Sequence, residues 1–89
     1  MKKMESPELA REAIFEIIAN QLRSNDPPET NKALKRLKEM GFDDLEAKKA
    51  IGRCVAVEIF GVIKYNKPFD LSRYVKNLNR LPEEPFDDE

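Results

Sequence analysis

Glu58 is a carboxylate in the middle of an otherwise apolar segment. Between positions 50 and 63 the only other charged residue is Arg53. At 100° per residue, a helix through this segment projects Glu58 between Cys54 and Val62, on its apolar side. A carboxylate in that position is costly unless it is paired or protonated. Glu58 is therefore the first residue for which the sequence demands a partner.

Gln21 has the same peculiarity in an earlier helix, where it follows the line of Ala10, Ile14 and Ile17. We hypothesise that Gln21 and Glu58 form a buried polar pair across two packed helices, directly or through a water molecule. The alternative is that Glu58 reaches solvent at a groove or at the rim of a dimer.

We expect no catalytic, cofactor-binding or metal site. General acid–base catalysis by Glu58 would need a second positioned group, and the sequence offers no His, no partner carboxylate at helical spacing and no reactive Ser motif. Metal sites in helical bundles use several inward carboxylates together with His. Cys54 has no cation on its face of the helix, which predicts an inert buried thiol. An enzyme that uses a buried Glu58 is kept as an alternative.

Composition excludes several other classes of function. The 89 residues are enough for one domain, and 16 basic against 17 acidic residues give a net charge of −1, so neither nucleic acid nor a membrane is an expected partner. With no His and one Cys, disulfide frameworks and zinc ribbons are not expected. No signal peptide or membrane-spanning run is apparent, so we expect a cytoplasmic protein with a reduced Cys54.

The charge is divided unevenly along the chain. Five of the last seven residues are acidic: Glu83, Glu84, Asp87, Asp88 and Glu89. The 16 basic and 12 remaining acidic residues give positions 1–81 a charge of +4. We expect a single domain over 1–81 and a solvated, disordered acidic tail over 82–89; folding of the tail onto basic helix faces is the alternative.

Apolar residues recur at spacings of three and four, which predicts an all-α, compact four-helix domain with helices over about 7–24, 28–40, 44–64 and 71–80. The expected helix starts are Ser6 with Pro7, Asp26, the Asp43–Glu46 capping box, and Asp70. Gly41 is expected to end the second helix in a left-handed conformation, with Phe42 packed back across that end. Gly52 and Gly61 permit close approach by a neighbouring backbone.

Two surface features could bind other molecules. Phe60 projects away from the main apolar stripe, on the side of Lys49, Arg53 and Lys64, and these four residues are the candidate interface. We therefore expect a non-catalytic module that associates with itself or with another protein. The second predicted helix carries a basic face, for which a solvated surface is the expectation rather than a phosphate site. That face comprises Lys32, Lys35, Arg36 and Lys38.

Residues 34–51 carry a partial likeness to a known family. The stretch Leu37-Lys38-Glu39-Met40-Gly41-Phe42, followed by Glu46-Ala47-Lys48-Lys49-Ala50-Ile51, resembles the first two helices of a ubiquitin-associated domain. The resemblance implies a ubiquitin-binding patch that includes Met40, Gly41 and Phe42. It covers about 18 residues of the chain, and the apolar run here continues past Ile51 to Ile63 without a turn signal.

A broader likeness covers nearly the whole chain. The order of Asn20-Gln21, Asp26-Pro27-Pro28-Glu29, Gly41-Phe42, Cys54, Glu58-Ile59-Phe60 and Pro68-Phe69-Asp70 is similar to small bacterial helical domains of unknown function. Such relatives often have His at the positions of Arg11, Phe15 and Lys49, which implies a polar or metal-binding site in them. All three positions are substituted here, so the resemblance supports fold and length rather than a metal site.

Overall fold

The computed structural model describes residues 7–84, and within that range the secondary structure is entirely helical. The helices are α1 (Pro7–Ser24), α2 (Pro28–Glu39), α3 (Asp44–Tyr65) and α4 (Leu71–Arg80). The predicted all-α four-helix domain is confirmed, and each helix boundary lies within one residue of its expected position. Most of the expected acidic tail lies outside the described residues.

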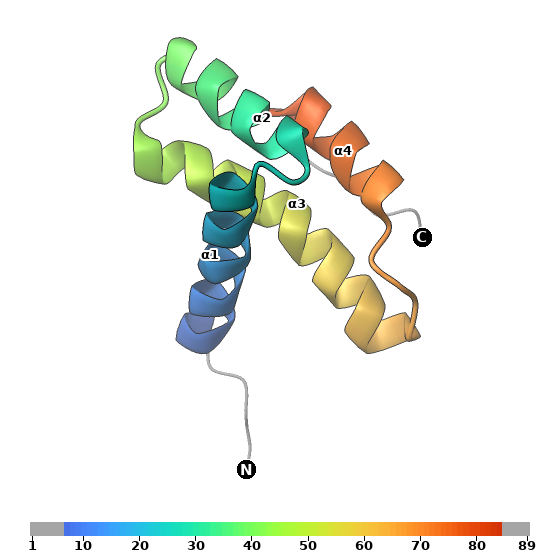
Figure 1. Ribbon diagram of the computed structural model, residues 1–89. Coiled ribbons are helices and arrows are strands. Elements are labelled where there is room, and N and C mark those ends of the chain that lie inside the picture. Colours follow the sequence, from blue (N-terminus) through green and yellow to red (C-terminus); the bar gives the residue numbers. More distant parts are fainter. Residues whose placement is uncertain (1–6, 85–89) are drawn as a thin grey trace.

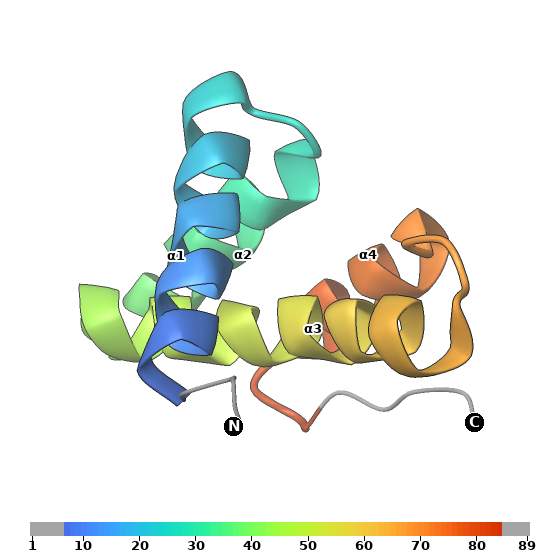
Figure 2. The same ribbon diagram turned by 90° about the horizontal axis from the view of Figure 1, so that it is seen from below.

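The long helix α3 is the element on which the others assemble (Figure 1). Helix α1 crosses the first half of α3, whereas α4 lies along its second half and beside α2 (Figures 1 and 2). The last turns of α3 therefore extend past α1 and have α4 and the connection to it as neighbours (Figure 2). None of the described helices is long and apolar enough to cross a membrane.

Two of the expected helix caps are confirmed. The Asp43 carboxylate accepts a hydrogen bond from the Glu46 backbone N–H at 2.7 Å, and the Asp43 N–H donates to the Glu46 carboxylate at 3.2 Å, which completes the capping box. At the start of α4, Asp70 Oδ1 accepts from the Arg73 N–H at 3.1 Å. These bonds satisfy backbone donors that have no partner within the helix.

The expected cap of α2 by Asp26 is wrong. Pro28 occupies the first helical position, so the cap position falls on Pro27, which has no side-chain acceptor, and no side-chain cap bond is formed. The backbone substitutes for it in part, because the Thr30 N–H donates to the Pro27 carbonyl at 3.2 Å. The prolines thus shift the helix start one residue beyond the reach of the Asp26 carboxylate.

The end of α2 is a Schellman motif, and it contains the left-handed Gly41 and the back-packed Phe42 that the sequence predicted. Gly41 has φ +107°, a conformation that few L-residues adopt. Its N–H donates to the Lys38 carbonyl at 3.0 Å, and the Phe42 N–H donates to the Leu37 carbonyl at 3.1 Å. The Phe42 side chain packs against the core, as expected. This motif turns the chain from α2 into α3 within four residues.

The core is formed by all four helices, and its buried hydrophobic residues are Ile18, Ala33, Leu37, Ala47, Ala50, Ile51, Cys54, Val55, Tyr74, Leu78 and Leu81. Gly52 lets α1 approach α3 closely, because a Cβ atom at this position would lie 3.2 Å from Cγ2 of Ile14. The expected close approach is thereby confirmed at Gly52.

The basic face of α2 is not uniformly solvated, and Arg36 requires a correction. Its Nη2 atom donates to the carbonyls of Leu78 at 3.0 Å and Leu81 at 2.8 Å. Both carbonyls lie at the end of α4, beyond the regular pattern of intrahelical hydrogen bonds, and the Leu78 carbonyl also accepts from the Leu81 N–H at 3.3 Å. Arg36 therefore fastens α4 to α2, while Lys38 forms an ion pair with Asp44 at 3.1 Å.

Candidate functional site

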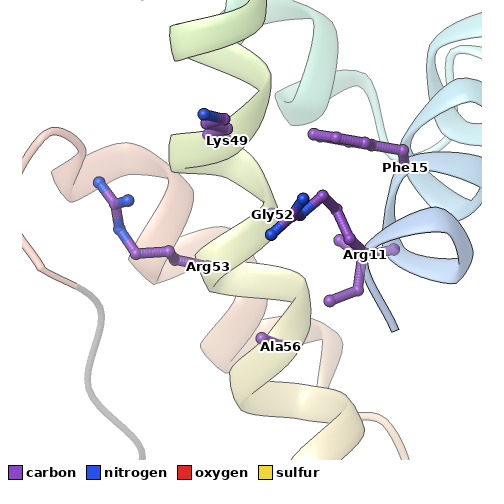
Figure 3. Close-up of a pocket in the computed structure, with 7 residues that line it drawn as sticks. Arg11, Phe15, Lys49, Gly52, Arg53 and Ala56 are labelled. Atoms are coloured by element: carbon purple, nitrogen blue, oxygen red, sulfur yellow. The ribbon is translucent and has the colours of Figure 1, made fainter. Parts of the chain in front are cut away.

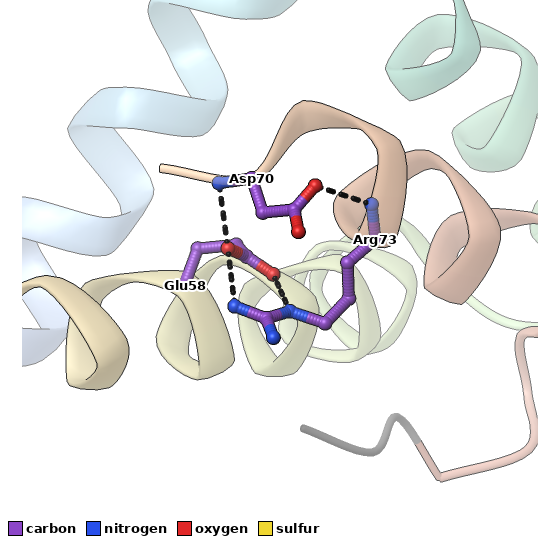
Figure 4. Close-up of polar contacts among 3 residues, drawn as sticks. All are labelled: Glu58, Asp70 and Arg73. Atoms are coloured by element: carbon purple, nitrogen blue, oxygen red, sulfur yellow. Dashed lines mark hydrogen bonds and ion pairs between the residues drawn. The ribbon is translucent and has the colours of Figure 1, made fainter. Parts of the chain in front are cut away.

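The buried carboxylate of Glu58 forms an ion pair with Arg73 of α4 (Figure 4). Arg73 donates from Nε to Oε2 at 2.7 Å and from Nη2 to Oε1 at 3.1 Å. The Asp70 backbone N–H donates to Oε1 at 2.9 Å. Glu58 is only 1% exposed. The forked guanidinium and the backbone N–H thus supply both carboxylate oxygens with charge-assisted hydrogen bonds.

Gln21 belongs to a different cluster, so the expected buried polar pair needs correction. Its Oε1 atom accepts from Thr30 Oγ1 at 2.7 Å and from Tyr74 OH at 2.6 Å, and the two hydroxyl oxygens lie 3.3 Å apart. No hydrogen bond within the described part of the chain joins Gln21 to Glu58. Both polar groups do have partners, but the partners come from α2 and α4.

Arg73 is the residue that sequence reasoning missed. It lies off the line of Leu71, Tyr74 and Leu78 on α4, where a solvated cation is the ordinary interpretation, yet its side chain is only 17% exposed. One signal was available, since Arg73 follows the Asp70 cap by three residues and therefore begins at the end of α4 nearest the connection from α3. A buried carboxylate on one helix also requires a cation on a neighbour.

The carboxylate oxygens of Glu58 are both occupied by protein donors. Both oxygens of Glu58 are already hydrogen-bonded, and a substrate would have to displace Arg73 to reach them. A nearby pocket of about 360 Å³ is lined by Asp70 and Arg73 but not by Glu58. The geometry therefore gives no support to acid–base catalysis at Glu58.

Cys54 is fully buried, and its thiol lies 3.9 Å from the Ala50 carbonyl one helical turn earlier. Burial raises the pKa of Cys54 from 9.0 to about 12, because the thiolate loses its hydration. The thiol is therefore protonated at neutral pH, as an inert core residue would be.

The Gln21–Thr30–Tyr74 cluster joins α1, α2 and α4. Burial raises the pKa of Tyr74 from 10.0 to about 12, because the phenolate would lose its hydration. The protonated phenol is the form that donates to Gln21, and it is the form present in the folded protein at neutral pH.

Replacing Gln21 by Met should lower the free energy of unfolding by about 1–3 kcal/mol, since it removes the acceptor that two buried hydroxyls share. Urea denaturation measures this change. A double-mutant cycle with Tyr74→Phe should give a coupling energy of at least about 0.5 kcal/mol. Strict additivity of the two substitutions would contradict the shared hydrogen bond.

The structure divides the candidate interface into two sites. Phe60 is 47% exposed, and the ammonium of Lys64 lies 5.3 Å from the centre of its ring. Lys49 and Arg53 instead line a pocket between α1 and α3. The same pocket is lined by Arg11 and Phe15, so Arg11, Phe15 and Lys49, which were compared in the sequence resemblance, lie together here.

Phe60 and Lys64 belong to a larger exposed surface, which we call the apolar end of α3. It consists of Lys64, Lys67 and the exposed large hydrophobic residues of the last turns of α3, the connection and the start of α4: Phe60, Val62, Ile63, Tyr65, Phe69 and Leu71. The rings of Phe60 and Tyr65 meet edge to face, with centres 6.1 Å apart. Lys64 and Lys67 each lie 5.8 Å from the centre of the Tyr65 ring.

Comparisons of the chain with protein-family models, with curated proteins and with solved structures found no match. The residues of the ubiquitin-associated likeness are only partly available on the surface. Met40 is 53% exposed, whereas Phe42 is half-buried against the core. Ubiquitin binding remains a prediction from the resemblance, and function is argued below from surface chemistry.

Proposed function

We propose that this protein is a non-catalytic interaction module whose partner is a second copy of the same chain, bound through the apolar end of α3. The observation that carries the proposal is the distribution of exposed hydrophobic residues. Six of the eight large ones in the described part of the chain lie between Phe60 and Leu71. Scattered apolar residues are normal on a protein surface, but a concentration of this kind is typical of an interface.

The position of these residues in the fold supports the proposal. Beyond Glu58, α3 has α4 on one side, and no other helix between residues 7 and 84 covers its remaining sides (Figure 2). Ile63 is consequently 78% exposed, although its helical position continues the apolar run of α3. A second chain packed against this end would bury aliphatic and aromatic side chains together, as the central part of an interface does.

Charge favours a second copy as the occupant. The apolar end of α3 includes two ammonium groups at its aromatic rings, Lys64 and Lys67. Residues 1–81 have a charge of +4, whereas residues 83–89 contain five acidic groups. The chain thus contains both the cationic, aromatic surface and an acidic segment of complementary charge. Glu83 forms an ion pair with Arg80 of its own chain at 3.1 Å, and the opposite charges of the remaining acidic residues and the lysines favour the approach of a second copy.

Sedimentation equilibrium tests the proposal on the full chain. We expect a dimer at concentrations of about 100 μM, and the variant Ile63→Asp should weaken association at least about tenfold by placing an unpaired charge in the contact. Leu45→Asp is the matched control, because Leu45 is also an exposed aliphatic residue of α3, at 54%, and lies outside the apolar end. It should associate like the wild type.

Two results would contradict the proposal. One is a wild-type monomer at all accessible concentrations, and the other is equal weakening by Ile63→Asp and Leu45→Asp.

Raising the salt concentration should weaken the dimer, since the acidic segment and the lysines attract one another across solvent. Replacing the five acidic residues of the segment by their amides should have the same effect as salt, and a dimer insensitive to both would exclude the acidic segment from the contact.

A further inference from the structure

A second surface, away from the apolar end of α3, gathers positive charge around a concave site. The pocket lies between α1 and α3, has a volume of about 510 Å³ and falls within the usual size of small-ligand sites. Its lining residues are Arg11, Ile14, Phe15, Lys49, Gly52, Arg53 and Ala56. Three of the seven are cations and none is acidic.

The three cations lack acidic partners. None of the ion pairs in the described part of the chain includes Arg11, Lys49 or Arg53. The acidic side chains at the start of α3 are used elsewhere, because Asp44 binds two other lysines and Glu46 closes the capping box. Like charges that lie near one another without a counter-charge raise the local potential and attract anions.

The packing of α1 on α3 creates the pocket. Gly52 brings the two helices together, and a side chain at this position would meet Ile14. Figure 3 shows Arg11 extending from α1 towards Gly52, with the Phe15 ring beside it and Lys49 on the facing helix. Arg53 lies one turn after Lys49 and points away in this view, but an exposed Arg side chain changes rotamer within nanoseconds.

The lining also has an apolar part. Phe15 and Ile14 are half-buried, so their exposed portions form one wall of the pocket. An aromatic ring accepts a planar group by stacking, while a guanidinium and an ammonium bind phosphate oxygens by charge-assisted hydrogen bonds. The chemistry of the site therefore matches an anion that has an attached planar or apolar group better than a bare anion.

We propose that this pocket binds a small phosphate ester, with the phosphate between Arg11 and Lys49 and the organic group against Phe15. Arg53 closes on the phosphate from the rim. The charged and apolar parts of the site make separate contributions, which can be measured with ligands that contain one part, the other or both.

An NMR titration with adenosine monophosphate, inorganic phosphate and adenosine tests this site. We expect the monophosphate ester to bind more tightly than either fragment, with saturable shifts at residues 11, 15, 49 and 53. Lys49→Gln and Arg11→Gln should each weaken its binding about tenfold, the loss expected for one charge-assisted hydrogen bond. Phe15→Leu should weaken binding of the ester but leave the affinity for inorganic phosphate unchanged.

Lys32→Gln is the matched control, because Lys32 is an exposed lysine of α2 outside the pocket. It should bind the ester like the wild type. Chemical shifts distant from the pocket report that each variant is folded. The proposal is overturned if the ester gives no saturable shift up to about 10 mM, or if Lys32→Gln weakens binding as much as Lys49→Gln does. Tighter binding of inorganic phosphate than of the ester would remove Phe15 from the site.

Discussion

Replacing Arg73 by Met is expected to lower the free energy of unfolding by about 3–5 kcal/mol at pH 7. The substitution keeps much of the side-chain volume but leaves Glu58, at 1% exposure, with the Asp70 N–H as its remaining donor in this cluster. A buried carboxylate without its cation retains the cost of desolvation and loses the compensating attraction. Urea denaturation followed by circular dichroism measures the effect.

A second substitution, at Glu58, distinguishes the cost of an unpaired buried charge from the loss of the Arg73 contacts. In the double variant Glu58→Leu/Arg73→Met most of the lost stability should return, because apolar residues can replace a buried ion pair without leaving an unpaired charge. Lys76→Met is the control for removing a cation from α4, since Lys76 is exposed, and it should change stability by less than about 0.5 kcal/mol. An Arg73→Met variant within about 1 kcal/mol of the wild type would show that the ion pair is not needed.

Alkaline pH should destabilise the native state through Cys54. Its pKa is about 12 in the folded protein and 9.0 when unperturbed, so the native thiol keeps its proton between these values while the unfolded thiol loses it. The unfolded state therefore gains stability as pH rises through this window, and the native state becomes less stable. The contribution of Cys54 should fall by about 2 kcal/mol between about pH 8 and pH 10.5.

The variant Cys54→Ala isolates this contribution, because lysines and other groups that titrate at high pH are common to both proteins. Unfolding free energies of wild type and variant are compared across the same pH range. The variant is less stable at pH 8, since it leaves a small cavity, but its disadvantage should shrink or reverse at pH 10.5. A constant difference across the range would mean that the native thiol titrates like that of the unfolded chain.

Local signals in the sequence were sufficient for the helices and most of their ends. The Asp43–Glu46 box, the Asp70 cap and the Gly41 turn each act within a few residues, and all three are formed. The prediction that Asp26 caps α2 was wrong by one position, because Pro28 is the first residue of the helix and the cap position falls on Pro27. Such features depend on backbone donors and dihedral angles of residues that are close in the chain. They can therefore be predicted without knowledge of tertiary contacts.

The sequence also identified which polar groups needed partners, but not the partners themselves. The position of Glu58 on an apolar stripe and of Gln21 on another followed from helical periodicity. Their assignment to one another was wrong because both lie on core-facing sides, and facing the core does not define which neighbour is within 3 Å. Glu58 meets Arg73, and Gln21 meets Thr30 and Tyr74.

The sequence by itself thus determined the four helices, most of their ends and the two polar residues on the apolar faces of α1 and α3. Only the tertiary structure decided that α4 supplies the cation for Glu58 and that Arg36 of α2 donates to the carbonyls at the end of α4. It also decided that Arg11 and Lys49 line one pocket. The physical reason is that the two kinds of information act over different distances along the chain. Helical periodicity fixes the direction of a side chain about its own axis, whereas its contacts depend on where two axes cross, which the packing of all four helices sets together.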